Sequence, residues 1–438
     1  MSLELRINQH PSRVALHNEI HARPPEALDM PLAISQVVMV CDAAQREASR
    51  QHLCALLRDR HLPLPDASST HLRVDVGQFR LRWELHTEFV TYTFTRQLAD
   101  GADVLLQVKR DPPVASDAIP REWLASLPGQ CLCSMHMWVL HRPDKDSHLL
   151  VKHLLQEDTL VGCAVADEQG EVFTDFAIHA DGFSRMLLLV KPGPGGMTQR
   201  RLGRMVQQLI EIETYRMAAL LGLPAAREAY SALATAEREL AELAQAIRVT
   251  SRDAEAQLLD RLTTLAGKVE SQHAASHSRF SASAAYFELV DKRIADIAES
   301  RVAGLQTIGE FMERRLTPAR STCEWATRRQ DALSQRVSRM SNLLRTRVEI
   351  EQQQSSQALL ATMNRRQDLQ LKLQSTVEGL SVVAITYYIV GLVAYLAKAL
   401  QKWGWPLSPE TSAALAIPCV AAGLWWLFRS LRRKMTAS

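Results

Sequence analysis

Histidine alternates with glutamate in two short stretches of the sequence. These residues are its best candidates for metal binding or acid–base chemistry. The first stretch is His17, Glu19 and His21, and the second is Glu84, His86 and Glu88. On an extended strand alternate residues share one face, and on a helix the two histidines of the first stretch do. Each stretch could therefore place imidazole and carboxylate groups beside one divalent metal ion. A joint site built by both stretches is the hypothesis for a metal-dependent enzyme.

A structural role suits the same residues better. Arg23 precedes two prolines, which favour an extended chain at that point. Its guanidinium group could pair with Glu19 or Glu88 in a charge-assisted cluster that pins the N-terminus to the sheet. We favour this structural cluster over metal binding. The sequence therefore predicts no catalytic residue, no resident metal and no cofactor.

Motifs of other common chemistries are missing from the sequence. It contains no G-x-S-x-G nucleophile motif, no P-loop and no G-x-G-x-x-G motif. The glycine-rich KPGPGG segment lacks a following Lys-Ser/Thr pair, so we interpret it as a linker. Lys and Arg number 51 against 48 Asp and Glu, a net charge of +3, which gives no support for a nucleic-acid partner.

Proline usage indicates which elements must position these residues. The chain has 438 residues, enough for two or three domains, and 13 of its 18 prolines lie at or before Pro194. Prolines interrupt helices, so the first part is turn-rich and the second is suited to long helices. We predict an α+β domain with a mixed or antiparallel sheet over residues 1–194. A long-helix, coiled-coil-like bundle and stalk should follow over residues 195–378.

Alternation of apolar and polar residues predicts the strands of the first domain. Apolar residues alternate over 79–85, and the phase then reverses at Val90, which indicates a hairpin near Thr87. The predicted strands are residues 34–40, 79–85, 90–94, 131–140, 160–166, 171–178 and 183–190, with a helix between the first strand and about Leu57. The first and second halves of this domain each show the same predicted order: a strand, a helix and then antiparallel strands. An internal duplication is therefore one interpretation.

Apolar residues recur with helical spacing after residue 199. We expect a first helix that stops at Gly222–Pro224, further helices over about 233–269, another from Val290 that breaks near Pro318, and a last helix from about Thr322 toward the membrane. Residues 345–358 contain few large apolar side chains. This segment is either a solvated stalk, which we favour, or a polar-cored seam of an oligomer.

Two uncharged runs near the C-terminus, residues 379–397 and 411–428, are predicted to span a membrane. At a 1.5 Å rise per residue the first run extends about 28 Å, close to the roughly 30 Å of a bilayer core. The short link between the runs makes them a hairpin, and the tail over 429–438 is basic. The positive-inside rule then places the N-terminal bulk and this tail in the cytoplasm. No signal peptide is evident at the N-terminus.

Polar residues recur every seven positions in the first run. They are Ser381, Tyr388 and Tyr395, and they share one helix face. Polar groups in lipid need partners, so this face should meet another helix or line a pore. Packing within the hairpin and packing in a homo-oligomer explain it equally well.

Several long phrases resemble a bacterial family known only as uncharacterised membrane-anchored proteins. They include LHNEIHARPPEAL, RWELHTEFVTY, EIETYRMAALLGLP and TVEGLSVVAITYYIVGL. The resemblance extends over nearly the whole chain. It implies an anchor in a bacterial inner membrane and brings no activity.

The order of elements also resembles the CorA-type magnesium and cobalt channels. Those channels have a cytoplasmic α/β domain, a long helix entering the membrane, two C-terminal spans and a basic tail. Their Gly-Met-Asn signature at the outer end of the first span is replaced here by Ala397-Lys398-Ala399-Leu400. Without that motif, and with Lys398 near the mouth, the resemblance gives little support for cation conduction.

The leading hypothesis is a non-enzymatic, membrane-anchored scaffold or sensor. It should be a homo-oligomer in the lipid bilayer and act through a protein partner that the sequence does not identify. A CorA-like cation channel is the first alternative, and a metal-dependent enzyme is the second.

Overall fold

The computed structural model describes residues 10–14, 16–17, 24–99, 108, 112–143, 147–249, 255–401 and 406–435, with side chains up to 430. The chain divides into two compact units. The first, here the sheet unit, comprises residues 1–250 and 260–339. The second, here the hairpin unit, comprises residues 251–259 and 340–438. Each unit is described by itself.

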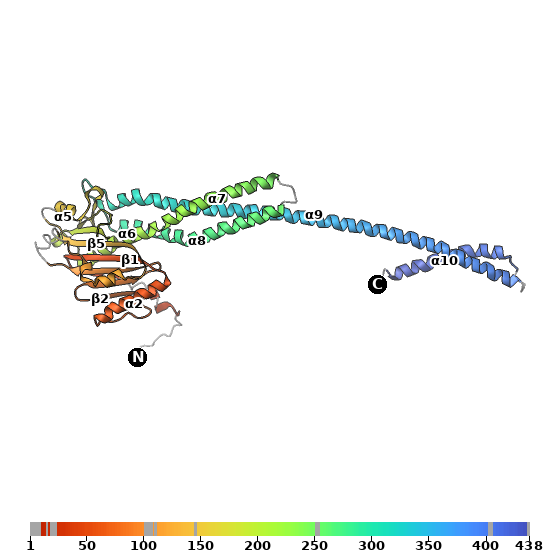
Figure 1. Cartoon of the computed structure of the whole chain (residues 1–438), viewed down its shortest axis with the longest axis horizontal. Helices are drawn as coiled ribbons and strands as arrows, with labels where there is room; N and C mark the ends of the chain where they lie inside the picture. The colour runs from red at the N-terminus through yellow and green to blue at the C-terminus, as the bar shows by residue number, and fades with distance from the viewer. Residues whose placement is uncertain are drawn as a thin grey trace, which may run out of the picture. The chain divides into compact units, whose positions relative to one another are not determined.

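Nine described strands of the sheet unit form one mixed sheet in the order β2-β3-β4-β1-β5-β8-β7-β6-β9 (Figure 1). Among these strand pairs only β5 and β8 are parallel. The bounds are β1 Leu32–Val40, β2 His71–Asp75, β3 Arg80–Leu85, β4 Phe89–Gln97, β5 Gln130–His141, β6 Val161–Val165, β7 Gly170–Thr174, β8 Ser184–Val190 and β9 Ser300–Arg301. The predicted mixed sheet is therefore confirmed, and its edge strand β9 comes from beyond residue 194.

Helices make up most of the remaining described chain. The α-helices are α2 Ala43–Asp59, α4 Arg121–Ala125, α5 Ser147–Leu154, α6 Gln199–Leu220, α7 Gly222–Val249, α8 Glu255–Asp296, α9 Ile308–Leu400 and α10 Pro409–Met435. Short 3-10 helices are η1 Ala115–Ala118, η2 Glu157–Thr159 and η3 Gly193–Gly195. The predicted long-helix region is confirmed.

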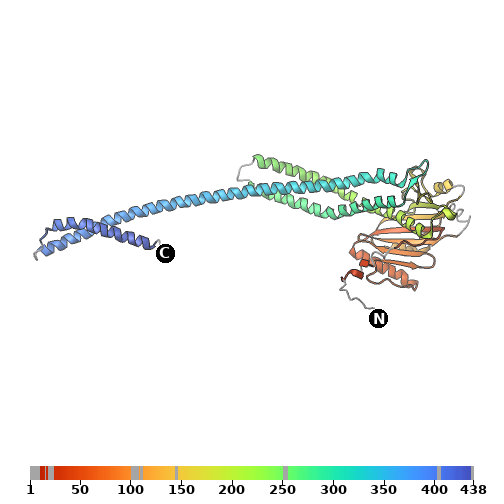
Figure 2. The ribbon, with the colours of Figure 1, turned by 180° about the vertical axis from the view of Figure 1, so that it is seen from behind.

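Helices cover both faces of the sheet. On one face, α2 packs on β3 and β4 around Trp83, and α5 packs on β5 and β8 around Trp138. On the other face lies α6, joined by α8 and the first turns of α9, around Ile34 and Leu188 (Figure 2). The sheet is therefore the middle layer of three, and its two faces meet different helices.

The β3–β4 hairpin follows directly from the reversed alternation in the sequence. β3 ends at Leu85 and β4 begins at Phe89, with the turn between them. Trp83 and Tyr92 are both fully buried on the α2 face. The reversal is needed because each strand must direct its apolar set to the same core.

Helices α7, α8 and the first part of α9 lie side by side as a bundle in both views (Figures 1 and 2). A small apolar core joins them through Ala226, Phe280 and Ala326. A bidentate pair between Arg329 and Glu237, with N···O distances from 2.5 Å, links α9 to α7. The bundle therefore holds the start of α9 by both apolar and charged contacts.

Pro318 does not break a helix, contrary to the prediction. It lies inside α9, which begins at Ile308 and continues past it without interruption. Proline removes one backbone hydrogen bond, but the buried side chains of Leu316 and Ala319 on either side secure this turn. The predicted helix from Val290 is instead the last part of the 42-residue α8, which begins at Glu255 and ends at Asp296.

Two further expectations of the first domain need correction. The strand expected over 171–178 ends at Thr174, because Phe176 has a positive φ of 51° that a strand cannot continue through. The strand orders β1-β4-β3-β2 and β5-β8-β7-β6 correspond to each other, as a duplication requires. However, β1 pairs with β4 antiparallel while β5 pairs with β8 parallel. The directions of the strands therefore do not support a duplication.

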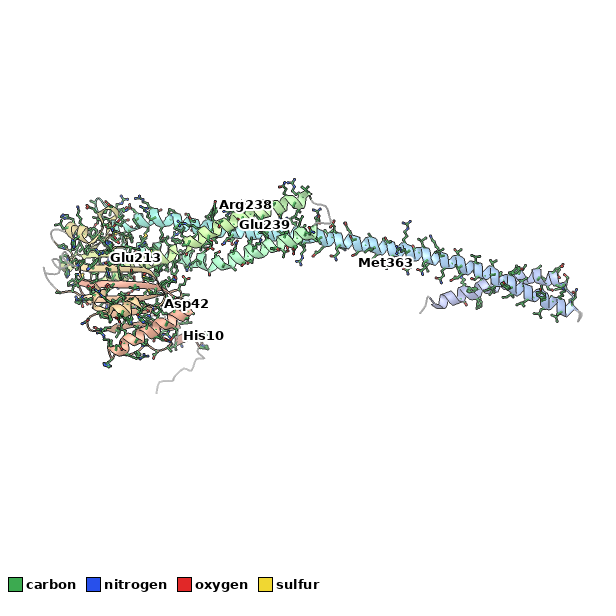
Figure 3. All side chains as sticks on the ribbon, in the orientation of Figure 1. His10, Asp42, Glu213, Arg238, Glu239 and Met363 are labelled. Atoms are coloured by element: carbon green, nitrogen blue, oxygen red, sulfur yellow. The ribbon has the colours of Figure 1, made fainter. Side chains whose placement is uncertain are left out.

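The hairpin unit contains the rest of α9 and all of α10. Residues 352–377 of α9 are exposed on every side, as the side chains around Met363 show (Figure 3). Two helices here are long and apolar enough to cross a membrane, and their apolar windows are 11% and 0% buried. A buried hairpin of a soluble core would show the opposite, so this exposure indicates membrane association.

Candidate functional site

A polar cleft lies between the sheet and α6. Its floor is formed by β3, β4 and β1, and α6 forms one wall. Its cavity volume is about 60 Å³. The polar residues lining it are Gln36, Arg82, Glu84, Thr91, Thr93 and Thr95 from the strands, Gln207, Glu211, Thr214 and Tyr215 from α6, and Glu26 and His86 from the loops.

Strand alternation explains why the floor is polar. The threonines of β4 alternate with apolar residues that pack beneath α2, so the hydroxyl groups face α6 instead. The register pairs Thr91 with Glu84 and Thr93 with Arg82 across β3 and β4. Thr91 is only 4% exposed, so its hydroxyl group is buried under the helix rather than solvated.

Ion pairs hold the charged side chains of the floor. The Arg82 Nη2 donates to Glu84 Oε1 at 2.7 Å, and the Arg80 Nη1 donates to Glu26 Oε1 at 2.6 Å. Glu84 is only 9% exposed, and such a buried carboxylate needs a charged partner. These pairs fix the long arginine side chains along the edge of the cleft.

An additional arginine raises the positive charge at this edge. Arg73 on β2 lies opposite Arg82 in the strand register, and its Nη2 donates to the carbonyl of Pro24. Burial and the neighbouring Arg82 lower the pKa of the Arg73 guanidinium below its usual value. The edge therefore carries more positive charge than the two glutamates balance.

The α6 wall is held close to the sheet by a glycine and by hydrogen bonds. A Cβ at Gly203 would lie 1.6 Å from the carbonyl oxygen of Glu26, so only glycine permits this approach. Thr214 donates to Gln36 Oε1 at 3.3 Å, and Gln207 Nε2 donates to Glu211 at 2.8 Å. Glu211 also pairs with an arginine of α8.

The second histidine–glutamate stretch lies at this cleft in part. Glu84 belongs to β3 and His86 to the following turn, and both line the cleft. The imidazole of His86 lies 4.6 Å from the ring of Phe89, centroid to centroid. Glu88, in the same turn, pairs instead with Arg279 of α8 at 2.9 Å. The strand placement expected for all three holds only for Glu84.

The first stretch is only partly within the described residues. His17 is exposed, while Glu19, His21 and Arg23 lie outside the described residues. The joint metal site and the Arg23 cluster therefore stay predictions. Among the residues that the structure describes, no group of three His, Cys, Asp or Glu side chains is placed to hold a metal ion.

A buried serine–histidine contact elsewhere in the sheet is structural. Ser35 Oγ lies 2.9 Å from His136 Nδ1 and accepts a hydrogen bond from the Ser116 N–H at 3.0 Å. The hydroxyl can accept from that amide and still either donate to Nδ1 or accept from it, depending on the imidazole tautomer. Burial lowers the pKa of His136 to about 4, so the imidazole is neutral at neutral pH. Ser35 is 0% exposed and does not line the polar cleft, so we assign it no role in binding.

The predicted helix face in the hairpin unit is open in the single chain. Tyr388 and Tyr395 are 72% and 77% exposed, and the Ser381 hydroxyl donates to the carbonyl of Val377 at 2.9 Å. Both tyrosines line an apolar groove of about 1100 Å³ that also touches Ile417 of α10. Whether the face packs against a helix or lines a pore stays a prediction.

Sequence reasoning missed most of the cleft. Arg82 and the threonines lie at the polar positions of two alternating strands. A strand face exposed to solvent shows the same alternation, so the pattern did not reveal a cleft. Gln207 and Gly203 gave no local signal, because their roles depend on α6 lying over strands more than 100 residues earlier. The arrangement offers hydrogen-bonding groups and charge for binding a polar molecule.

Comparison with known proteins gives one match. A family model described as "Protein of unknown function (DUF3422)" matches residues 8–435. No curated protein and no solved structure matches the chain. The resemblance to an uncharacterised family is thereby confirmed, while the likeness to CorA-type channels stays a prediction.

Proposed function

Because the chain belongs to the DUF3422 family, whose description assigns no activity, we propose from the geometry a membrane-anchored scaffold or sensor without catalytic activity. Its sheet unit would act at the cytoplasmic face of a bacterial inner membrane. The observation that carries the proposal is the continuity of α9.

α9 combines two environments in one helix. Ile308 and Met312 near its start are 0% and 4% exposed in the core of the sheet unit. Leu380, Val383 and Leu396 near its end are 67%, 68% and 61% exposed. Exposing this many apolar side chains to water costs free energy, whereas contact with hydrocarbon does not. A continuous helix that starts in a folded domain and ends in a lipid-compatible segment is suited to tethering that domain to a membrane.

The charge pattern supports the cytoplasmic orientation. Arg429 follows the second apolar run directly, and the remaining tail is also basic. The segment before the first run carries Arg365, Arg366 and Lys372. Basic residues concentrate on the cytoplasmic side of membrane helices. Both ends of the hairpin would then face the cytoplasm.

Self-association is the second part of the proposal. Tyr388 and Tyr395 present hydroxyl groups on a face that has no protein cover in the single chain. Hydroxyl groups inside a bilayer gain most when they meet another polar group. A second copy of the same hairpin supplies that group by symmetry.

Thiol labelling tests the orientation. Cys131 is exposed in the sheet unit, and Ser408→Cys places a thiol just before α10, in the link between the spans. In intact spheroplasts a membrane-impermeant maleimide should label Ser408→Cys and leave Cys131 unlabelled. Inverted vesicles should give the reverse. The protein without the Ser408→Cys change is the control. Labelling of Cys131 from outside would contradict the orientation.

Flux and metal content test the absence of conduction and catalysis. The full chain, purified in detergent and reconstituted in liposomes, should pass no magnesium, and the same sample should contain no stoichiometric metal. Saturable magnesium flux would favour the channel alternative. Bound metal lost on changing His21 and His86 together would favour the metal-dependent enzyme.

A further inference from the structure

Packing alone does not account for the polar floor of the cleft. On the neighbouring strands α6 buries apolar side chains such as Met205 and Leu209 against apolar partners. Over β4 it meets threonines, among them Thr91 at 4% exposure. Valine has nearly the same shape and buries no hydroxyl group. Threonine at a buried position therefore needs a partner for its hydroxyl.

Three polar atoms of the cleft are buried without a hydrogen-bond partner in the part of the chain that the structure describes. They are Thr91 Oγ1, Arg82 Nε and Gln207 Oε1. The Arg82 Nε–H can only donate, the glutamine oxygen can only accept, and the hydroxyl group can do both. A molecule that satisfies all three must carry an acceptor for Arg82 and a donor for Gln207.

The charge of the cleft selects the kind of acceptor. Each of the three carboxylates that line the cleft has an arginine partner: Glu26 pairs with Arg80, Glu84 with Arg82 and Glu211 with Arg293. Arg73 does not line the cleft, but it lies opposite Arg82 in register, donates to the Pro24 carbonyl and adds positive charge beside Arg82. An oxyanion at Arg82 would be stabilised by a charge-assisted hydrogen bond.

We infer that the cleft binds a small anion with a carboxylate or phosphate group, held by Arg82 and the Thr91 hydroxyl. A hydroxyl group of the same molecule would donate to Gln207. This site goes beyond the proposed function and does not depend on the membrane anchor, since all three residues belong to the sheet unit. Binding of this anion would be the signal that the proposed sensor detects.

Thermal unfolding of the full-length protein in detergent tests the site. Inorganic phosphate and malate are the probes, because each combines an oxyanion with a hydroxyl group, and sodium chloride at equal ionic strength is the control. The melting temperature should rise saturably with one probe, and the effective probe identifies phosphate or carboxylate as the ligand group. No saturable rise with either probe would overturn the inference.

Matched variants separate binding from folding. Thr91→Val removes only the unpartnered hydroxyl group, so the melting temperature without anion should be unchanged or higher, while anion affinity should fall roughly tenfold. Thr235→Val is the control, because that hydroxyl donates to the Ser231 carbonyl on α7, away from the cleft. Equal anion affinity in Thr91→Val and Thr235→Val would refute a role for the cleft.

Discussion

The buried imidazole of His136 should make the sheet unit less stable in mild acid. It is 2% exposed, shares a hydrogen bond with Ser35 and stacks on Phe183 with ring centroids 3.9 Å apart. Burial lowers its pKa from 6.5 to about 4, with Arg185 adding to the effect and Asp181 opposing it. The folded protein therefore holds the neutral form in a pH range where the unfolded chain takes up a proton.

The sign and size of the effect follow from these values. Between pH 7 and pH 5 the unfolded chain binds the proton and the folded protein does not, so stability falls as pH falls. A solution at pH 5 is about 1.5 units below the pKa of the imidazole in the unfolded chain. Each unit of this difference is worth about 1.4 kcal/mol of unfolding free energy. The free energy of unfolding should therefore drop by about 2 kcal/mol from pH 7 to pH 5.

Urea unfolding at both pH values, followed by the near-ultraviolet circular dichroism of the buried tryptophans, measures this drop. His136→Gln keeps an acceptor for Ser35 and cannot titrate, so about 2 kcal/mol of the pH dependence should disappear. His148→Gln, at an exposed position, is the matched control and should retain it. A pH dependence equal in wild type and His136→Gln would refute this assignment.

Two substitutions test the packing of the same unit. Gly203→Ala should lower the melting temperature, because the added Cβ would overlap the carbonyl of Glu26. Gly267→Ala on α8 is the control, since its added Cβ meets nothing within 4 Å. This control should be neutral or stabilising by up to about 1 kcal/mol. Ser49→Ala should cost about 2–4 kcal/mol in urea unfolding, because its hydroxyl accepts from the buried Trp83 indole at 3.0 Å and bonds a buried tyrosine hydroxyl. A cost below about 0.5 kcal/mol would contradict that network.

Local patterns in the sequence were sufficient for most elements. Alternation located β3 and β4 with their hairpin, because each strand directs one apolar set into a core. The two uncharged runs located the apolar parts of α9 and α10, because composition alone marks a lipid-compatible helix. β2, with the sequence HLRVD, was missed because only two of its five residues are apolar.

Long-range packing accounts for what local patterns could not predict. The continuation of α9 through Pro318 depends on buried contacts with α8, which no local rule contains. The contact between Ser35 and His136 joins residues 101 positions apart. The cleft likewise requires α6 to lie over β4, and neither element alone distinguishes a buried polar floor from a solvated face.

Extraction of native membranes tests the central claim most directly, because the proposed function rests on α9 and α10 lying in lipid. After cell lysis and an alkaline carbonate wash, the full-length protein should remain in the membrane pellet and be released only by detergent. Recovery of the intact protein in the aqueous supernatant without detergent would contradict the account.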